Sequence, residues 1–63
     1  MKTKDGYTIS TVEQDGHYAG EELGRVFVLR ENGYDWFSFE PEEIESAVRT
    51  FETLTLAEIR EQF

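Results

Sequence analysis

The sequence contains no cysteine, a single histidine, a single proline and no long apolar run. Without cysteine there is neither a disulfide framework nor a Cys-based zinc site, so the 63 residues depend on apolar packing for stability. A chain of this length accommodates one domain, residues 1–63. No apolar run approaches the roughly 18 residues of a membrane span, and MKTKDGYTIS lacks the apolar segment of a secretion signal. We therefore expect a cytoplasmic protein.

Basic residues are also scarce. Six Lys and Arg stand against 14 Asp and Glu, a net charge of −8, and residues 34–63 contribute −6 because eight acids there face two bases. This balance argues against direct binding to nucleic acid or to an anionic membrane, since both partners require basic patches. A basic protein surface is the complementary partner. Two other interpretations are that the charge serves solubility or that it reflects adaptation to a salty cytoplasm.

Aromatic residues, in contrast, are plentiful, with five Phe, three Tyr and one Trp. The alternating stretch 7–14 is typical of a β-strand. RVFVLRE (25–31) and YDWFSFE (34–40) flank the dipeptide Asn32-Gly33, which is a strong short-range signal for a β-hairpin. The three segments together predict an antiparallel meander.

The hairpin turn predicts how the two strands face each other. A two-residue type I′ turn at Asn32-Gly33 pairs Glu31 with Tyr34 and Arg30 with Asp35, and the latter two are expected to form an ion pair. Alternation then produces two apolar faces, and one layer of helices cannot bury both. The first face, predicted to lie in the core, comprises Val26, Val28, Phe37 and Phe39. The second, predicted either to be covered or to form an interface, comprises Phe27, Leu29, Tyr34 and Trp36.

The C-terminal third predicts helices. Pro41 suits the first helical position, and acids in the first turn favour the positive end of the helix dipole. An apolar stripe at helical spacing follows: Ile44, Ala47, Val48, Phe51 and Leu54. Threonines in the stretch 50–56 favour a break, after which Thr55 and Glu58 have capping-box spacing. A second short helix would bury Leu56, Ile59 and Phe63, although one longer helix is the alternative.

These elements predict an α+β fold: a three-stranded antiparallel meander followed by one C-terminal helix and a second short helical segment. The core is expected to join the first sheet face to Ile44, Val48, Phe51 and Leu54.

Catalytic and metal-binding patterns are missing from the sequence. With one histidine, His17, and no cysteine, a nucleophile–base triad is excluded within this chain. Glu13, Asp15, His17, Glu21 and Glu22 are close in sequence, but their spacing matches no calcium loop and leaves zinc without enough ligands. The stretch 17–24 is interpreted as a polar loop. We predict no catalytic residue, no metal, no cofactor and no enzymatic activity.

The acidic stretches FEPEEIES and QDGHYAGEE suggest a class of protein. Short, cysteine-free, aromatic-rich and strongly acidic chains of this kind resemble the small phage-encoded inhibitors that mimic DNA, including anti-CRISPR proteins. The resemblance implies a one-to-one blocker of a nucleic-acid-binding protein, although Arg49 and Arg60 interrupt the helical rows of carboxylates. The predicted contact residues are Glu40, Glu42, Glu43, Glu45, Glu21, Glu22, Phe27, Leu29, Tyr34 and Trp36. The alternative is a structural or regulatory accessory domain, with a homodimer possible through the Phe27, Leu29 and Trp36 sheet face.

Overall fold

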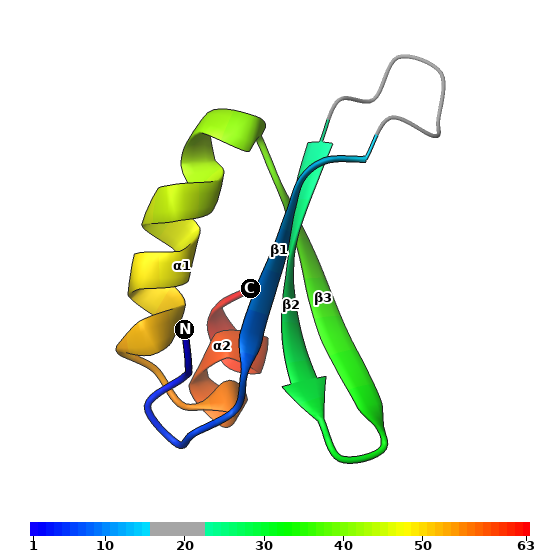
Figure 1. Cartoon of the computed structure of the whole chain (residues 1–63). Coiled ribbons are helices and arrows are strands. Elements are labelled where there is room, and N and C mark those ends of the chain that lie inside the picture. Colours follow the sequence, from blue (N-terminus) through cyan, green and yellow to red (C-terminus); the bar gives the residue numbers. More distant parts are fainter. Residues whose placement is uncertain (16–22) are drawn as a thin grey trace.

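A computed structural model of the chain describes residues 1–15 and 23–63. Three antiparallel strands form one sheet in the order β1-β2-β3, and two helical pieces follow (Figure 1). The predicted α+β fold is therefore confirmed, and the break between the helices excludes one long helix. The elements are β1 (Ile9–Asp15), β2 (Leu23–Arg30), β3 (Gly33–Phe39), the 3-10 turn η1 (Pro41–Glu43), α1 (Ile44–Glu52) and α2 (Leu56–Gln62).

The boundaries differ slightly from the predicted ones. The strand predicted at 7–14 begins at Ile9, and β2 already includes Leu23 and Gly24, which the sequence had placed in the loop 17–24. The rest of that loop, with Glu21 and Glu22, lies outside the described residues.

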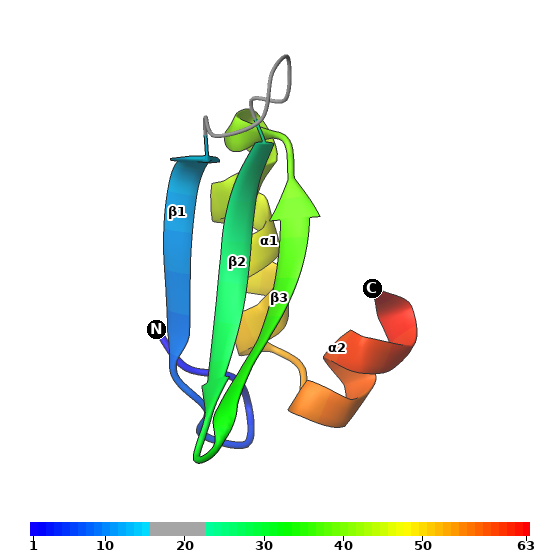
Figure 2. The same cartoon turned by 90° about the vertical axis from the view of Figure 1, so that its right-hand side faces the viewer.

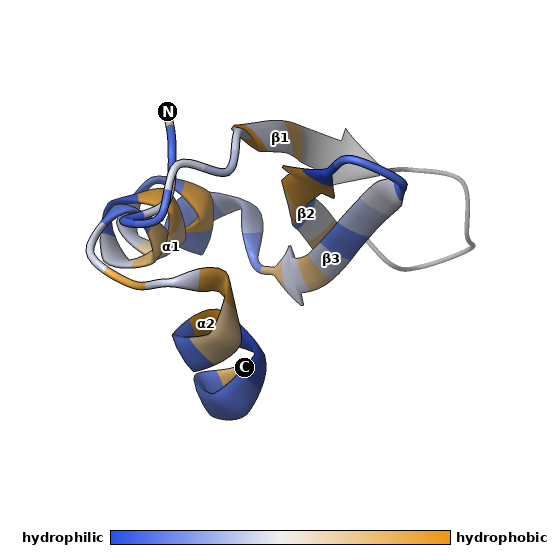
Figure 3. Ribbon diagram, turned by 90° about the horizontal axis from the view of Figure 1, so that it is seen from below, coloured by the Kyte–Doolittle hydropathy of each residue, from blue (hydrophilic) through white to orange (hydrophobic). Residues whose placement is uncertain are grey.

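Both helices cover the same face of the sheet. Figure 2 shows α1 behind the strands and α2 beyond β3, and Figure 3 shows both on one side of the sheet. Helix α1 packs against β1 and β2. The molecule is therefore a two-layer structure with one sheet face turned inward and one turned outward.

The core lies between the inner sheet face and the two helices. The predicted packing is confirmed, because Val26 and Val28 are buried against Ile44, Val48 and Phe51, with Phe37, Phe39 and Leu54 partly buried around them. Among the residues whose side chains the structure describes, the buried apolar ones are Ile9, Val26, Val28, Ile44, Ala47, Val48, Phe51, Leu56 and Ile59.

Phe63 was expected to be buried and is not. Its side chain is 51% exposed, although its ring meets the ring of Phe51 edge to face at 5.1 Å between centroids. Its position directly after the last residue of α2, Gln62, places it at the margin of the core. Ile59, one turn earlier, and Leu56, two turns earlier, are buried as predicted.

The hairpin is present, but its register differs by two residues from the predicted one. Arg30 pairs with Gly33, so the loop consists of Glu31 and Asn32. A type I′ turn needs positive φ at both loop residues, whereas neither Glu31 nor Asn32 has one, and Gly33, directly after the loop, has a φ of 150°. Because side chains alternate with period two, this shift leaves every residue on its predicted face. Arg30 and Asp35 are therefore diagonal neighbours, and their predicted ion pair is present at 3.4 Å.

The start of α2 is fixed by side chains from two distant parts of the chain. Thr55 accepts a hydrogen bond from the backbone N–H of Glu58 (3.2 Å), and the Glu58 carboxylate accepts one from the N–H of Thr55 (3.0 Å), which confirms the predicted capping box. The Asp5 carboxylate accepts a further bond from the N–H of Leu56 (3.2 Å) and one from the Thr3 hydroxyl (2.7 Å). The N-terminal segment thus anchors the junction between the helices.

Candidate protein-binding surfaces

The outward face of the sheet is the first candidate surface. The pairing places Val12, Arg25, Phe27, Leu29, Tyr34 and Trp36 on this outer sheet face. Tyr34 and Trp36 are 55% and 54% exposed, and Leu29 and Val12 are exposed as well, because both helices lie on the other side. Exposed clusters of this kind often mark interfaces, and Tyr and Trp are frequent anchors in them.

The outer sheet face has a distinct chemistry. The guanidinium of Arg25 lies over the Trp36 ring, 4.5 Å from its centroid, and also donates to the Ser38 hydroxyl at 2.8 Å. Phe27 and Tyr34 make an edge-to-face contact with centroids 5.4 Å apart. No acidic residue belongs to this face within the described parts of β1 to β3 up to Val12 and from Leu23 onward.

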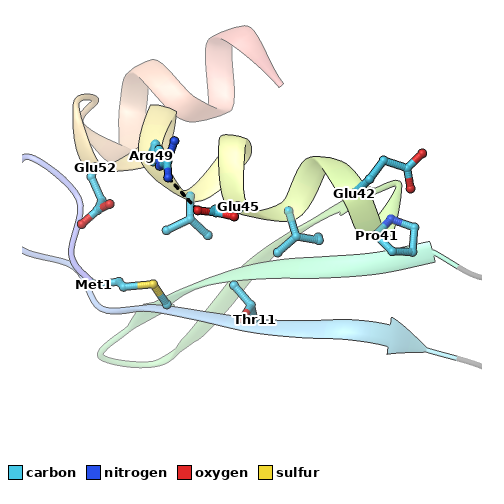
Figure 4. Close-up of a pocket in the computed structure, with 9 residues that line it drawn as sticks. Met1, Thr11, Pro41, Glu42, Glu45, Arg49 and Glu52 are labelled. Carbon is cyan, nitrogen blue, oxygen red and sulfur yellow. Dashed lines mark hydrogen bonds and ion pairs between the residues drawn. The ribbon is translucent and has the colours of Figure 1, made fainter.

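A groove between α1 and the edge strand β1 is the second candidate surface. This α1–β1 groove encloses about 500 Å³ and is drawn in Figure 4. Pro41 and Glu42 lie at one end, and Met1 and Glu52 lie at the other. Its lining comprises Met1, Thr11, Pro41, Glu42, Ile44, Glu45, Val48, Arg49 and Glu52.

Carboxylates follow one side of the α1–β1 groove. Glu42, Glu45, Arg49 and Glu52 are separated by three, four and three residues, the spacing of a single helical face. At 1.5 Å per residue, this row extends over about 15 Å. Arg49 donates to Glu45 at 2.6 Å, an exposed pair one helical turn apart. Three acidic side chains and one basic side chain line the groove, so these side chains together carry a charge of −2.

The predicted contact residues do not form one continuous surface. Glu42 and Glu45 border the α1–β1 groove, whereas Glu43 lines a hollow on another side of α1 with Phe39 and Phe63. Glu40 is exposed at the junction between β3 and η1. The aromatic residues Phe27, Leu29, Tyr34 and Trp36 lie on the outer sheet face, and the sheet separates them from α1.

Sequence reasoning missed part of the groove. Met1 and Thr11 contribute to it from the N-terminal segment and β1, and Glu52 extends the carboxylate row. Thr11 pairs with Val26 and therefore belongs to the inner sheet face. Alternation along the first strand would have indicated this face once the pairing of that strand was known. The sequence analysis did not include Arg25 in the outer sheet face, although Arg25 is two residues before Phe27 in the same strand and therefore points to the same side.

The carboxyl groups with a shifted pKa lie at the junction between α1 and α2, outside both the outer sheet face and the α1–β1 groove. The hydrogen bond from Thr3 lowers the pKa of Asp5, and the bond from the Leu56 N–H acts in the same direction. The backbone and hydroxyl of Thr55 lower the pKa of Glu58. Since both groups serve as capping acceptors, their ionised state supports the fold.

In the described portion of the chain, no three His, Asp or Glu side chains are gathered closely enough to hold a metal ion. No helix within residues 1–15 and 23–63 has the length and apolarity to cross a membrane. Comparisons with protein-family models, curated proteins and solved structures returned no match to the chain.

Proposed function

We propose that this protein is a non-catalytic, cytoplasmic binding module that inhibits a nucleic-acid-binding protein by covering that partner's basic surface. The observation that carries the proposal is the row of carboxylates at Glu42, Glu45 and Glu52 along the α1–β1 groove. Regularly spaced carboxylates attract the same Lys and Arg side chains that bind phosphates, because both are anionic acceptors on a repeating scaffold. In this proposal the protein acts as a DNA mimic with the character of an anti-CRISPR or other phage inhibitor.

Salt and charge neutralisation test the proposal. Tagged protein is used to capture partners from a lysate of the source cells, and the complex is washed with about 1 M NaCl, which shortens the screening length to about 3 Å. The captured protein is expected to bind nucleic acid, to release it when this chain is added in equimolar amount, and to dissociate at high salt. The triple variant Glu42→Gln, Glu45→Gln and Glu52→Gln is expected to keep its far-UV circular dichroism and to lose inhibition.

Glu31 and Glu61 provide a control of the same substitution type, because both are exposed glutamates away from α1. The Glu31→Gln and Glu61→Gln double variant is expected to inhibit as the wild type does. Equal inhibition by the triple variant, or capture that persists through the salt wash, would show that the carboxylate row does not carry the binding.

The outer sheet face favours a second candidate function, a homodimeric accessory domain. Tyr34 and Trp36 are more than half exposed on a face free of acidic residues in its described part, so two copies could join there without opposing their negative charges. Sedimentation equilibrium over a range of concentrations tests this. A dimer that Trp36→Thr abolishes would support the accessory domain, and a monomer at all concentrations would exclude it.

A further inference from the structure

The free edge of β1 has main-chain groups available for another strand. The Leu29 N–H donates to the Thr8 carbonyl at 2.9 Å, which shows that Thr8 directs its main chain toward β2. In an antiparallel ladder the main-chain N–H and C=O of successive residues point alternately to either side of the strand. The N–H and C=O of Ile9 and Thr11 therefore point away from β2. Ile9 confirms the alternation, because its N–H donates to the Met1 carbonyl at 2.9 Å.

Part of this edge is already used as a strand-pairing edge. Lys2 forms an isolated antiparallel bridge with Thr8, and Met1 accepts from Ile9, so residues 1–2 run alongside the beginning of β1. Thr11 is the next residue whose main-chain N–H and C=O point away from β2. None of the other described residues forms a backbone hydrogen bond with these groups. The edge therefore accepts an antiparallel segment at Ile9 and is open at Thr11.

Thr11 belongs both to the open edge and to the α1–β1 groove (Figure 4). A segment that pairs with Thr11 points every second side chain to the same side as Thr11, which is the space between β1 and α1. There these side chains would meet Ile44 and Val48, the apolar part of the groove lining. Main-chain bonds at an edge with alternate side chains in a groove are a known mode of peptide recognition.

The charges at the groove select the kind of segment. Glu45 is paired with Arg49, whereas Glu42 and Glu52 have no ion pair with any described residue. Carboxylates at both ends of the groove favour Lys or Arg on the incoming segment, and the apolar lining favours Val or Ile between them. A second copy of this chain is disfavoured, because it would bring its own row of glutamates against the first.

We propose that the α1–β1 groove accepts an extended segment of a partner protein, which adds to β1 at Thr11 as a fourth strand and whose groove-facing residues, every second one, are Val or Ile at the centre and Lys or Arg at the ends. This inference rests on the proposed function and specifies how the basic partner binds. It requires main-chain pairing in addition to charge attraction, so the two proposals are tested by different readouts.

A synthetic peptide tests the pairing. The probe is a capped peptide of about eight residues, a common strand length, with Lys, Val, Val and Lys at the odd positions and Thr at the even positions. Two N-methylated versions of it have the same charge: one blocks the N–H groups of the odd residues, the other those of the even residues. In a strand, alternate N–H groups face opposite edges, so only one of the two can pair with β1. Binding is followed by amide chemical shifts of the isotopically labelled protein.

The unmodified peptide is expected to shift the amides of Thr11 and Val48, and one N-methylated version is expected to bind at least about tenfold more weakly than the other. The Glu42→Gln and Glu52→Gln double variant is expected to bind the peptide about tenfold more weakly at low salt. The double variant at Glu31 and Glu61 is the control with the same change in charge and is expected to bind as the wild type does.

Equal affinity of the two N-methylated peptides would overturn the fourth-strand inference and leave the charge-based proposed function standing. Three other results would also overturn it: chemical-shift changes centred on Trp36, self-association of the protein, and no detectable binding up to about 1 mM peptide. Failure of the proposed function is recognised separately, by unchanged inhibition with the Glu42, Glu45 and Glu52 triple variant.

Discussion

Arg60 donates two hydrogen bonds to a single carboxylate oxygen of Asp35, from Nε at 3.1 Å and from Nη2 at 2.7 Å. The two residues are 25 positions apart, and the contact joins α2 to β3. Arg30 approaches the same oxygen at 3.4 Å, so Asp35 is placed between two guanidinium groups. A helix as short as α2 is not stable in isolation, and this pair is one of the contacts that hold it against the sheet.

Removal of the Arg60 charge is expected to lower the free energy of unfolding modestly. The Asp35 side chain is only 22% exposed but Arg60 is 50% exposed, so solvent screens the pair and Arg60→Met is expected to cost about 0.5–1 kcal/mol. Urea unfolding followed by circular dichroism measures the loss. Since salt screens the pair, the difference should shrink at about 1 M NaCl. Arg49→Met, which removes the more exposed pair with Glu45, is the control and should cost less.

Acid is expected to weaken the junction between the helices through Asp5 and Glu58. Hydrogen bonds lower the pKa of both carboxyls in the folded state, so each stabilises the fold above its ordinary pKa of about 3.9 or 4.3. This contribution is lost as the pH falls from those values through the lower folded pKa values. Unfolding free energies measured from about pH 6 down to about pH 2 should therefore decline below about pH 4.5.

The matched variants for the acid effect are Asp5→Asn and Glu58→Gln, which retain oxygen acceptors but do not titrate. Their double variant should show a flatter decline below about pH 4.5 than the wild type. Glu61→Gln, at an exposed position of the same helix, should leave the decline unchanged. A decline equally steep in the double variant would place the acid sensitivity elsewhere.

The hairpin loop makes opposite predictions for Asn32 and Gly33. Gly33 has a φ of 150°, a conformation that side chains with a Cβ rarely adopt, so Gly33→Ala is expected to cost more than about 1 kcal/mol. Asn32 has no positive φ, and Asn32→Ala is expected to change stability by less than about 0.5 kcal/mol. In a type I′ turn Asn32 would need positive φ and its replacement would be costly. Denaturant midpoints of the two variants thus distinguish the observed turn from the predicted one.

Local patterns in the sequence were sufficient for most of the fold. The capping box at Thr55 and Glu58 involves residues three apart, and the two sheet faces follow from a period of two, so neither depends on distant contacts. The register of β2 against β3, which makes Glu31 and Asn32 the loop residues, could not be predicted from local patterns. Periodicity does not distinguish a shift of two residues, and the Asn-Gly signal describes a turn type that this loop does not use.

The candidate surfaces were only partly predictable, because their composition depends on tertiary arrangement. Sequence alternation assigned Tyr34 and Trp36 to the second sheet face but left open whether that face is covered, and the structure shows both residues exposed. The α1–β1 groove brings Thr11 to α1 residues more than 30 positions later, and no local pattern contains that relationship. The same holds for Asp5, whose bond to the Leu56 N–H joins opposite ends of the chain.

Two phenylalanines in contact are expected to differ sharply in their importance for stability. Phe51 is fully buried and its ring meets those of Phe37, Phe39 and Phe63, so Phe51→Ala is expected to cost about 3–5 kcal/mol. At about 0.05–0.15 kcal/mol per residue, the whole chain has only about 3–9 kcal/mol available. Phe63 is half exposed, and Phe63→Ala is expected to cost about 1 kcal/mol because roughly half of the transfer free energy of a Phe side chain is lost.

Thermal unfolding followed by circular dichroism compares the two phenylalanine variants. Phe51→Ala should be largely unfolded at room temperature, whereas Phe63→Ala should melt cooperatively a few degrees below the wild type. Similar losses for both would mean that Phe63 is buried in solution by another chain or by a second copy. That result would direct attention to the hollow formed by Phe39, Glu43 and Phe63, because burial of Phe63 requires a surface that closes over it.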